Sequence, residues 1–92
     1  MHVYLVCFDI SDDRIRYRVD KCLGSYGDRV QKSVFEISVK TKPQFKKLQT
    51  QLEEMIDVDD KLFFYHLCYS CRKKSVDTNN QPLAQLPAAV IV

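Results

Sequence analysis

The carboxylate of Asp9 is the first group in this sequence whose type and position could support chemistry. Asp9 directly follows an apolar run, HVYLVCF at positions 2–8, which predicts a buried strand. Magnesium commonly takes one or two protein carboxylates and keeps water for a substrate phosphate, and it can neutralise charge that builds on a phosphodiester. A lone carboxylate at a strand end is more often a turn or helix-cap residue. Asp9 gains catalytic interest if a two-fold axis brings two copies together.

Three arginines are candidates for binding phosphate, because a planar guanidinium suits phosphate better than an ammonium does. Arg16 and Arg18 would point about 200° apart on a helix, so they cannot bind one phosphate together. Arg16 lies four residues from both Asp12 and Asp20, and a helix-surface ion pair is its plain interpretation. Arg29 precedes a predicted strand and could face solvent or a partner. Such contacts position a nucleic acid without reading its sequence.

The charge of the chain is unevenly spread, although its net charge is only +2. Residues 14–47 hold ten basic and three acidic side chains, a net +7, which leaves the rest of the chain at −5. This asymmetry indicates a basic surface of the kind that a phosphate backbone uses. His2, His66 and Ser33 have no sequence neighbour that would mark an acid–base pair or a nucleophile.

The four cysteines predict neither a metal site nor a structural disulfide. Cys68 and Cys71 have the two-residue gap of a zinc knuckle, but no second pair lies at matching spacing. Cys7 lies in the apolar run and Cys22 on an apolar helical stripe, where cysteine behaves as a small hydrophobe. A structural disulfide is not expected in a reducing cytosol.

Periodicity and cap residues predict the elements that must position these groups. Ser11–Asp13 offers N-cap side chains after the first strand, and an apolar stripe then predicts a helix. Gly24 or Gly27 is expected to end that helix in a left-handed conformation. Residues 29–40 alternate imperfectly, which predicts two short strands or one strand with a bulge near Lys32–Ser33.

The second half of the chain completes a ferredoxin-like pattern. A capping box, Thr41-x-x-Gln44 with Pro43 in the first turn, starts a second helix. Residues 57–60 then form a turn and residues 61–69 a strand. The order βαββαβ predicts an α+β sandwich with two helices on one face of an antiparallel sheet.

The other face of the predicted sheet is also apolar. In the last strand Phe63, Tyr65 and Leu67 alternate with an equally apolar set on the opposite side. An exposed apolar face of this kind needs a cover, and the same face of another copy supplies one. We therefore expect a homodimer through this face, while a monomer covered by its own tail stays an open alternative.

The predicted domain spans residues 1–69, and residues 70–92 form a C-terminal tail. Its apolar end, residues 88–92, could add an edge strand. The chain holds no run of about 18 uncharged apolar residues that could span a membrane, and its start lacks the basic region of a signal peptide. We expect a cytoplasmic protein with no membrane partner.

Three motifs carry a resemblance to a known family. They are FDISDD at positions 8–13, Arg16-x-Arg18-Val19, and YGDRVQKSVFE at positions 26–36. In these motifs the sequence resembles the CRISPR-associated protein Cas2 family. That family opens with a strand closing in Tyr-Asp-Ile, continues with an arginine-bearing helix and has a Gly-x-Arg-x-Gln-x-Ser-Val-Phe segment. The resemblance covers residues 2–69.

The resemblance implies a ferredoxin-like homodimer of CRISPR adaptation, part of antiviral defence, with a Mg²⁺ ion near Asp9. It also implies metal-dependent endonuclease activity on RNA or DNA in some members. The site residues that it implies are Asp9 for catalysis and metal binding, and, for nucleic acid, Arg16, Arg18, Arg29 and Phe35. Phe8 stands where tyrosine is common, which implies the loss of a hydroxyl beside the proposed metal.

Two functions of different classes stay open. In the first, the dimer is a magnesium-dependent phosphodiesterase acting on RNA or duplex DNA. In the second, it is a DNA-binding scaffold that bridges two copies of the Cas1 integrase during spacer acquisition. The basic stretch serves either function, whereas only the first needs Asp9. A ferredoxin-like regulatory domain that binds a small ligand is a third hypothesis, because a shared fold says little about function.

Overall fold

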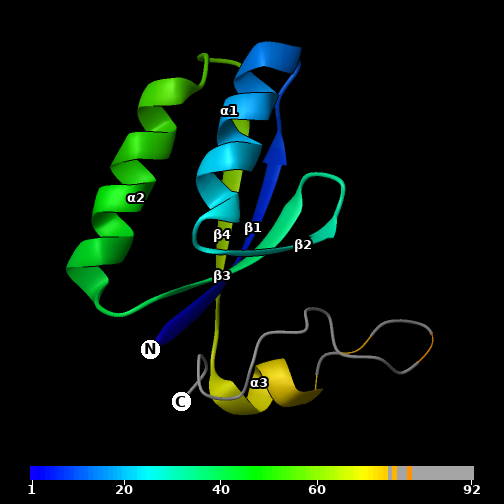
Figure 1. The fold of residues 1–92 in the computed structure, drawn as a ribbon, viewed down its shortest axis with the longest axis vertical. Helices are drawn as coiled ribbons and strands as arrows, with labels where there is room; N and C mark the ends of the chain where they lie inside the picture. The colour runs from blue at the N-terminus through cyan, green and yellow to red at the C-terminus, as the bar shows by residue number, and fades with distance from the viewer. Residues whose placement is uncertain (75, 77–78, 80–92) are drawn as a thin grey trace.

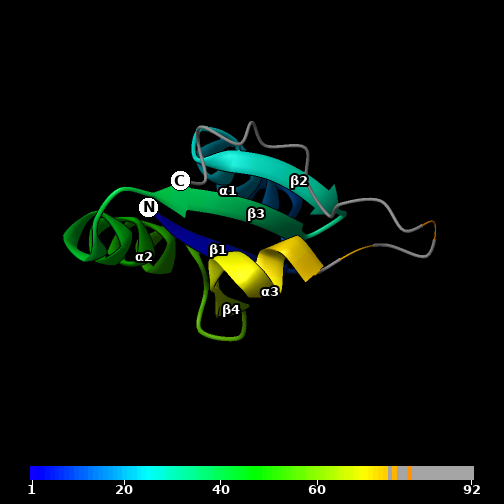
Figure 2. The same cartoon turned by 90° about the horizontal axis from the view of Figure 1, so that it is seen from below.

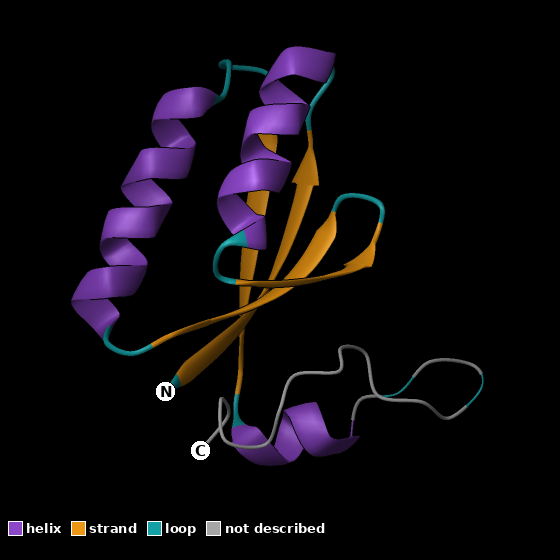
Figure 3. Cartoon of the chain, in the orientation of Figure 1, coloured by secondary structure: helices purple, strands orange, loops and turns teal. Residues whose placement is uncertain are grey.

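The computed structural model describes residues 1–74, 76 and 79 of the chain. Its elements, drawn in Figures 1 and 3, are β1 (His2–Asp9), α1 (Asp13–Gly24), β2 (Gly27–Gln31), β3 (Val34–Val39), α2 (Lys42–Met55), β4 (Lys61–Leu67) and α3 (Tyr69–Lys74). The order confirms the predicted ferredoxin-like α+β fold. The final strand was predicted to reach Tyr69, but it ends at Leu67, and the short helix α3 was not predicted.

The four strands form one antiparallel sheet in the order β2-β3-β1-β4. Helices α1 and α2 lie side by side over one face, while α3 lies beyond the end of β4 (Figures 1 and 2). The core fills the space between this face and the two helices. It is built from alternate residues of β1 and β3 and from the apolar stripes of the helices: Tyr4, Val6, Phe8, Phe35, Ile37, Val39, Val19, Leu23, Leu48 and Leu52.

The strand alternation places a different set of side chains on the other face of the sheet. We call this the second face and define it by Leu5, Cys7 and Asp9 of β1 and Phe63 and Tyr65 of β4, which pair across the two strands. Phe63 is 46% exposed and Tyr65 is 53% exposed. The predicted apolar character of this face is therefore confirmed for these two aromatic residues.

Both long helices begin at the predicted caps. The Asp12 carboxylate accepts hydrogen bonds from the backbone N–H groups of Arg14 (2.8 Å) and Ile15 (3.1 Å). The Thr41 hydroxyl accepts one from the Gln44 N–H at 3.2 Å, with a proline in the first turn of α2. Each cap satisfies backbone donors that the helix itself leaves unpaired.

The prediction of a left-handed glycine after α1 is wrong. Ser25 caps α1 in a right-handed conformation, and none of the glycines has a positive φ. Gly27 is instead required by packing, because a Cβ there would collide with the Glu36 carbonyl group. The left-handed residue among those described is Ser33 (φ 71°), in the turn between β2 and β3. These are the two predicted strands, with a register shift between Arg29 and Gln31.

The tail is described only in part. The predicted edge strand at residues 88–92 lies outside the described residues, and the proposed boundary at residue 69 stays a prediction. Within the part of the chain that the structure describes, none of the helices is long and apolar enough to cross a membrane.

Candidate functional site

Asp9 lies exposed at the end of β1, on the second face of the sheet. Its register partner on β4 is Lys61, and the preceding second-face pair is Cys7 with Phe63. Among the described residues there is no cluster of three or more potential metal ligands. The single carboxylate of Asp9 nevertheless fits magnesium, which accepts one or two carboxylates and keeps several waters. A complete pair of carboxylates would need a second copy.

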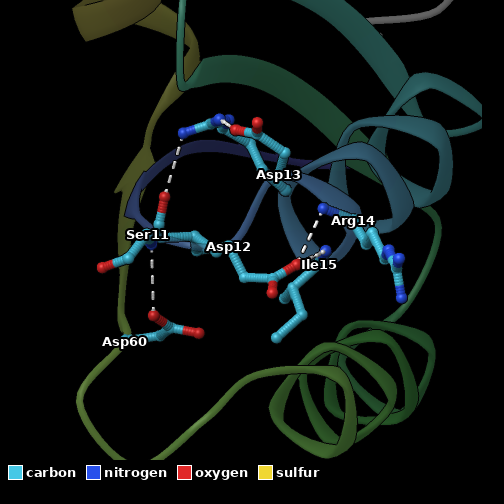
Figure 4. Close-up of polar contacts among 8 residues, drawn as sticks. Ser11, Asp12, Asp13, Arg14, Ile15 and Asp60 are labelled. Atoms are coloured by element: carbon cyan, nitrogen blue, oxygen red, sulfur yellow. Dashed lines mark hydrogen bonds and ion pairs between the residues drawn. The ribbon is translucent and has the colours of Figure 1, made fainter.

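The segment after Asp9 is held in place by polar contacts to neighbouring elements (Figure 4). The Ser11 N–H donates to Asp60 Oδ1 at 3.4 Å, which ties the segment to the turn before β4. Arg16 Nη1 donates to the Ile10 carbonyl oxygen at 3.1 Å, and Arg16 also pairs with Asp13. Arg16 thus positions the chain between Asp9 and α1. The ion pair predicted with Asp12 or Asp20 forms with a different carboxylate.

Asp12 shows the electrostatic consequence of its cap geometry. The backbone N–H groups of Ile15 and Arg14 hold the pKa of the Asp12 carboxyl below its ordinary value of 3.8. They do so because they donate hydrogen bonds to the charged form. The Asp12 carboxylate therefore caps α1 and is not free to act as a second metal ligand beside Asp9.

The side chain of Phe8 lies away from Asp9. It is buried in the core, with its ring 6.3 Å from the Phe35 ring between centroids. Because neighbouring residues of a strand point to opposite faces, Phe8 and Asp9 lie on different sides of the sheet. The side chain at position 8 points away from the proposed metal. Contrary to the prediction, phenylalanine at this position therefore does not remove a hydroxyl from beside that metal.

Arg18 lies on an exposed basic face of α1. We define this basic face by Arg14, Tyr17, Arg18 and Lys21, all of which are exposed. The ammonium of Lys21 lies 5.6 Å from the centre of the Tyr17 ring. Sequence analysis did not single out Tyr17, although its spacing of three residues from Arg14 and four from Lys21 was the signal that could have placed it on this face.

Arg29 reaches back to the helix layer. It donates to Asp20 Oδ2 at 2.7 Å, and its guanidinium carbon lies 5.4 Å from the centre of the Phe35 ring. Phe35 is only 4% exposed, so it supports Arg29 from the core and presents no open ring for base stacking. The nucleic-acid roles of Arg29 and Phe35 stay predictions.

A groove runs along α2 and past the turn that follows α1. Its charged side chains are Lys42, Lys46, Lys47 and Glu54 of α2, and Tyr26 also lines it. The lysines were counted in the basic stretch of the sequence. Their gathering beside Tyr26 depends on how α2 packs, which the charge count did not show.

These features define the class of protein as a ferredoxin-like α+β fold with an exposed carboxylate on the second face and a basic first helix. The model of the family described as CRISPR associated protein Cas2 matches residues 1–75. The chain belongs to the Cas2 family.

Named relatives and solved structures agree with this membership. The CRISPR-associated endoribonuclease Cas2 4 of Rhodospirillum rubrum is 41% identical over 84% of this chain, and the match spans only 62% of that relative. The endoribonuclease Cas2 3 of Synechocystis is 37% identical over the full length of both. A chain of a partial Cas6-RT-Cas1–Cas2 complex matches over both full lengths at 38% identity and a TM-score of 0.82. The Streptococcus pyogenes Cas2 crystal structure has a TM-score of 0.72 at 33% identity, covering 83% of this chain and 96% of that one.

Proposed function

We propose that this chain is a Mg²⁺-dependent endonuclease that cleaves RNA or DNA as a homodimer and takes part in spacer acquisition. The observation that carries the proposal is the exposed Asp9 carboxylate, which ends β1 on the second face beside an arginine-bearing helix. The relatives are named as endoribonucleases, and these names support the same class of reaction.

Asp9 would hold the magnesium ion, which supplies an activated water and neutralises charge on the phosphodiester when it is bound. Arg16 keeps Asp9 in position, because it fixes the Ile10 carbonyl and the start of α1. Arg18 and its neighbours on the basic face of α1 bind the phosphate backbone. Their contacts are independent of base sequence, so the substrate is recognised by its charge and shape.

The second face supports the homodimer. Phe63 and Tyr65 are half exposed there, and Phe63 belongs to the second-face pair that precedes Asp9. Pairing this face with its own copy buries the aromatic side chains and brings two Asp9 carboxylates toward one axis. The two parts of the proposal, dimerisation and metal binding, therefore depend on the same surface.

A scaffold that binds DNA and bridges Cas1 subunits is the second candidate function. It is favoured by the likeness to the chain from the Cas6-RT-Cas1–Cas2 complex, which covers all of both chains. This function uses the basic face of α1 and the lysines of α2 and needs no chemistry at Asp9.

The test compares Asp9→Asn with Asp59→Asn, a matched change at an exposed carboxylate in the turn before β4. RNA and duplex DNA cleavage are measured with magnesium present, and spacer integration is measured with Cas1. We expect Asp9→Asn to abolish cleavage while Asp59→Asn retains it, because only Asp9 is placed to hold the metal.

Unchanged cleavage in Asp9→Asn would contradict the endonuclease proposal. If integration survives while cleavage is lost, the scaffold function is the one that adaptation uses.

A further inference from the structure

Two cysteine thiols lie exposed at the junction between β4 and α3. Cys68 directly follows β4, and Cys71 lies in the first turn of α3. Lys61, the register partner of Asp9, begins the same strand, so the thiols and Asp9 lie at opposite ends of β4 (Figure 1). The cysteine pair is therefore separate from the proposed nuclease site.

Local hydrogen bonds gather on the sulfur of Cys68. The backbone N–H of Cys71 donates to Cys68 Sγ at 3.4 Å. The Ser70 hydroxyl lies 3.4 Å from the same sulfur. Donors directed at sulfur stabilise a thiolate, which is the form that acts as a nucleophile.

The thiols of the chain consequently differ in reactivity. Hydrogen bonds from Ser70 and Cys71 lower the pKa of the Cys68 thiol to about 7. The pKa of Cys71 is raised, first by its hydrogen bond to Cys68 and then by the charge of that neighbour. Burial raises the pKa values of Cys7 and Cys22. At neutral pH about half of the exposed Cys68 thiol is thus in the thiolate form, and the protonated Cys71 thiol is hydrogen-bonded to it.

We propose that Cys68 and Cys71 form a redox-active dithiol that exchanges with low-molecular-weight disulfides, with Cys68 as the attacking and Cys71 as the resolving cysteine. The two-residue spacing, the shared exposure and the direct contact at Cys68 Sγ are the features that carry this assignment. A metal site would need further ligands, and no cluster of three or more is found among the described residues.

The exchange balances in two steps. The Cys68 thiolate attacks one sulfur of oxidised glutathione, so that a protein–glutathione S–S bond forms as the glutathione S–S bond breaks. The leaving glutathione thiolate takes a proton from solvent. Cys71 then loses its proton to solvent and attacks the Cys68 sulfur, and the second glutathione leaves as a thiolate that takes a proton from solvent. The two cysteines are oxidised to a disulfide, and the glutathione disulfide is reduced to two thiols.

The experiment treats the reduced full chain with oxidised glutathione and maps the modified cysteines by peptide mass spectrometry. We expect a Cys68–Cys71 disulfide that a dithiol reductant reverses. Cys71→Ser is expected to trap glutathione on Cys68, because the resolving thiol is gone. Cys68→Ser should form neither product, and Cys22→Ser, a control at a half-buried cysteine outside the pair, should behave as the parent does.

Alkylation of the parent protein across pH supplies a second measurement. Modification of Cys68 should reach half its maximal rate near pH 7, below the midpoint of every other cysteine. Equal trapping of glutathione in the two single variants, or a midpoint for Cys68 no lower than that of Cys71, would overturn the proposal. Neither measurement depends on nuclease activity, so failure here is distinguishable from failure of the proposed function.

Discussion

At the scale of the residue, the three arginines that are candidates for binding phosphate divide into two kinds. Arg16 and Arg29 are held by protein partners, the first by Ile10 and Asp13 and the second by Asp20. Arg18 is exposed, and no such contact holds it among the described residues. A guanidinium already engaged within the chain must give up its partner before it can bind phosphate fully. Arg18 can bind phosphate without first breaking such a contact.

Replacing Arg18 and Arg29 by alanine separates binding from stability. Arg18→Ala should leave the free energy of unfolding unchanged and weaken nucleic-acid binding, with the salt dependence reduced by about one unit of slope. Arg29→Ala should lower the free energy of unfolding by roughly 1 kcal/mol, because its ion pair and ring contact are lost. Salt titrations of binding and denaturant unfolding of both variants check this. Equal destabilisation by the two changes would contradict the division.

At the scale of the element, the start of α1 depends on a titrating cap, whereas that of α2 does not. Asp12 accepts two backbone hydrogen bonds in its charged form. Thr41 accepts its hydrogen bond through a hydroxyl that does not titrate. The two helices should therefore respond differently to acid.

The pH dependence of stability should identify Asp12 as this cap. Its folded pKa lies below 3.8, so its contribution is full above that value and is lost as pH falls through the lower folded pKa. The melting temperature of Asp12→Asn should fall below that of the parent at neutral pH, and the gap should shrink in acid. Thr41→Ala should cost about 1 kcal/mol at every pH. Thermal unfolding over a pH series measures the effects of both substitutions. If the difference in melting temperature between Asp12→Asn and the parent stayed constant with pH, Asp12 would not be the titrating cap.

At the scale of the whole molecule, the two faces of the sheet differ in how far their apolar side chains are buried. The face under α1 and α2 forms the core, and β4 leaves Phe63 and Tyr65 half exposed on the second face. A small chain has a thin core, so burial of a second apolar face adds stability that it otherwise lacks. Self-association is the expected use of this face.

Glutamate at Phe63 or Tyr65 should break the proposed homodimer. A buried, unpaired carboxylate opposes association, and the dissociation constant should rise roughly 30-fold or more, as for loss of a contact worth about 2 kcal/mol. Val58→Glu is the control, because Val58 is 97% exposed in the turn before β4. Sedimentation of the parent and of the three variants gives the result. A monomeric parent would remove the geometry that a shared Asp9 site needs.

Much of this architecture is readable from local chemistry. The caps at Asp12 and Thr41, the two helical stripes and the two strands around Ser33 each depend on residues close in the chain. Interactions between near neighbours are repeated in many folds, so their patterns can be recognised without coordinates. The same locality makes the motifs around Asp9 and Arg29 sufficient to indicate the family.

The sequence by itself therefore determined the order of the elements from β1 to β4, the fold class and the family. Tertiary structure decided which candidate groups remain accessible. The Asp20–Arg29 pair joins residues nine positions apart on α1 and β2, and Phe35 lies buried beneath it. Such contacts depend on where the helix crosses the sheet, a relation between packed elements that spacing along the chain does not encode.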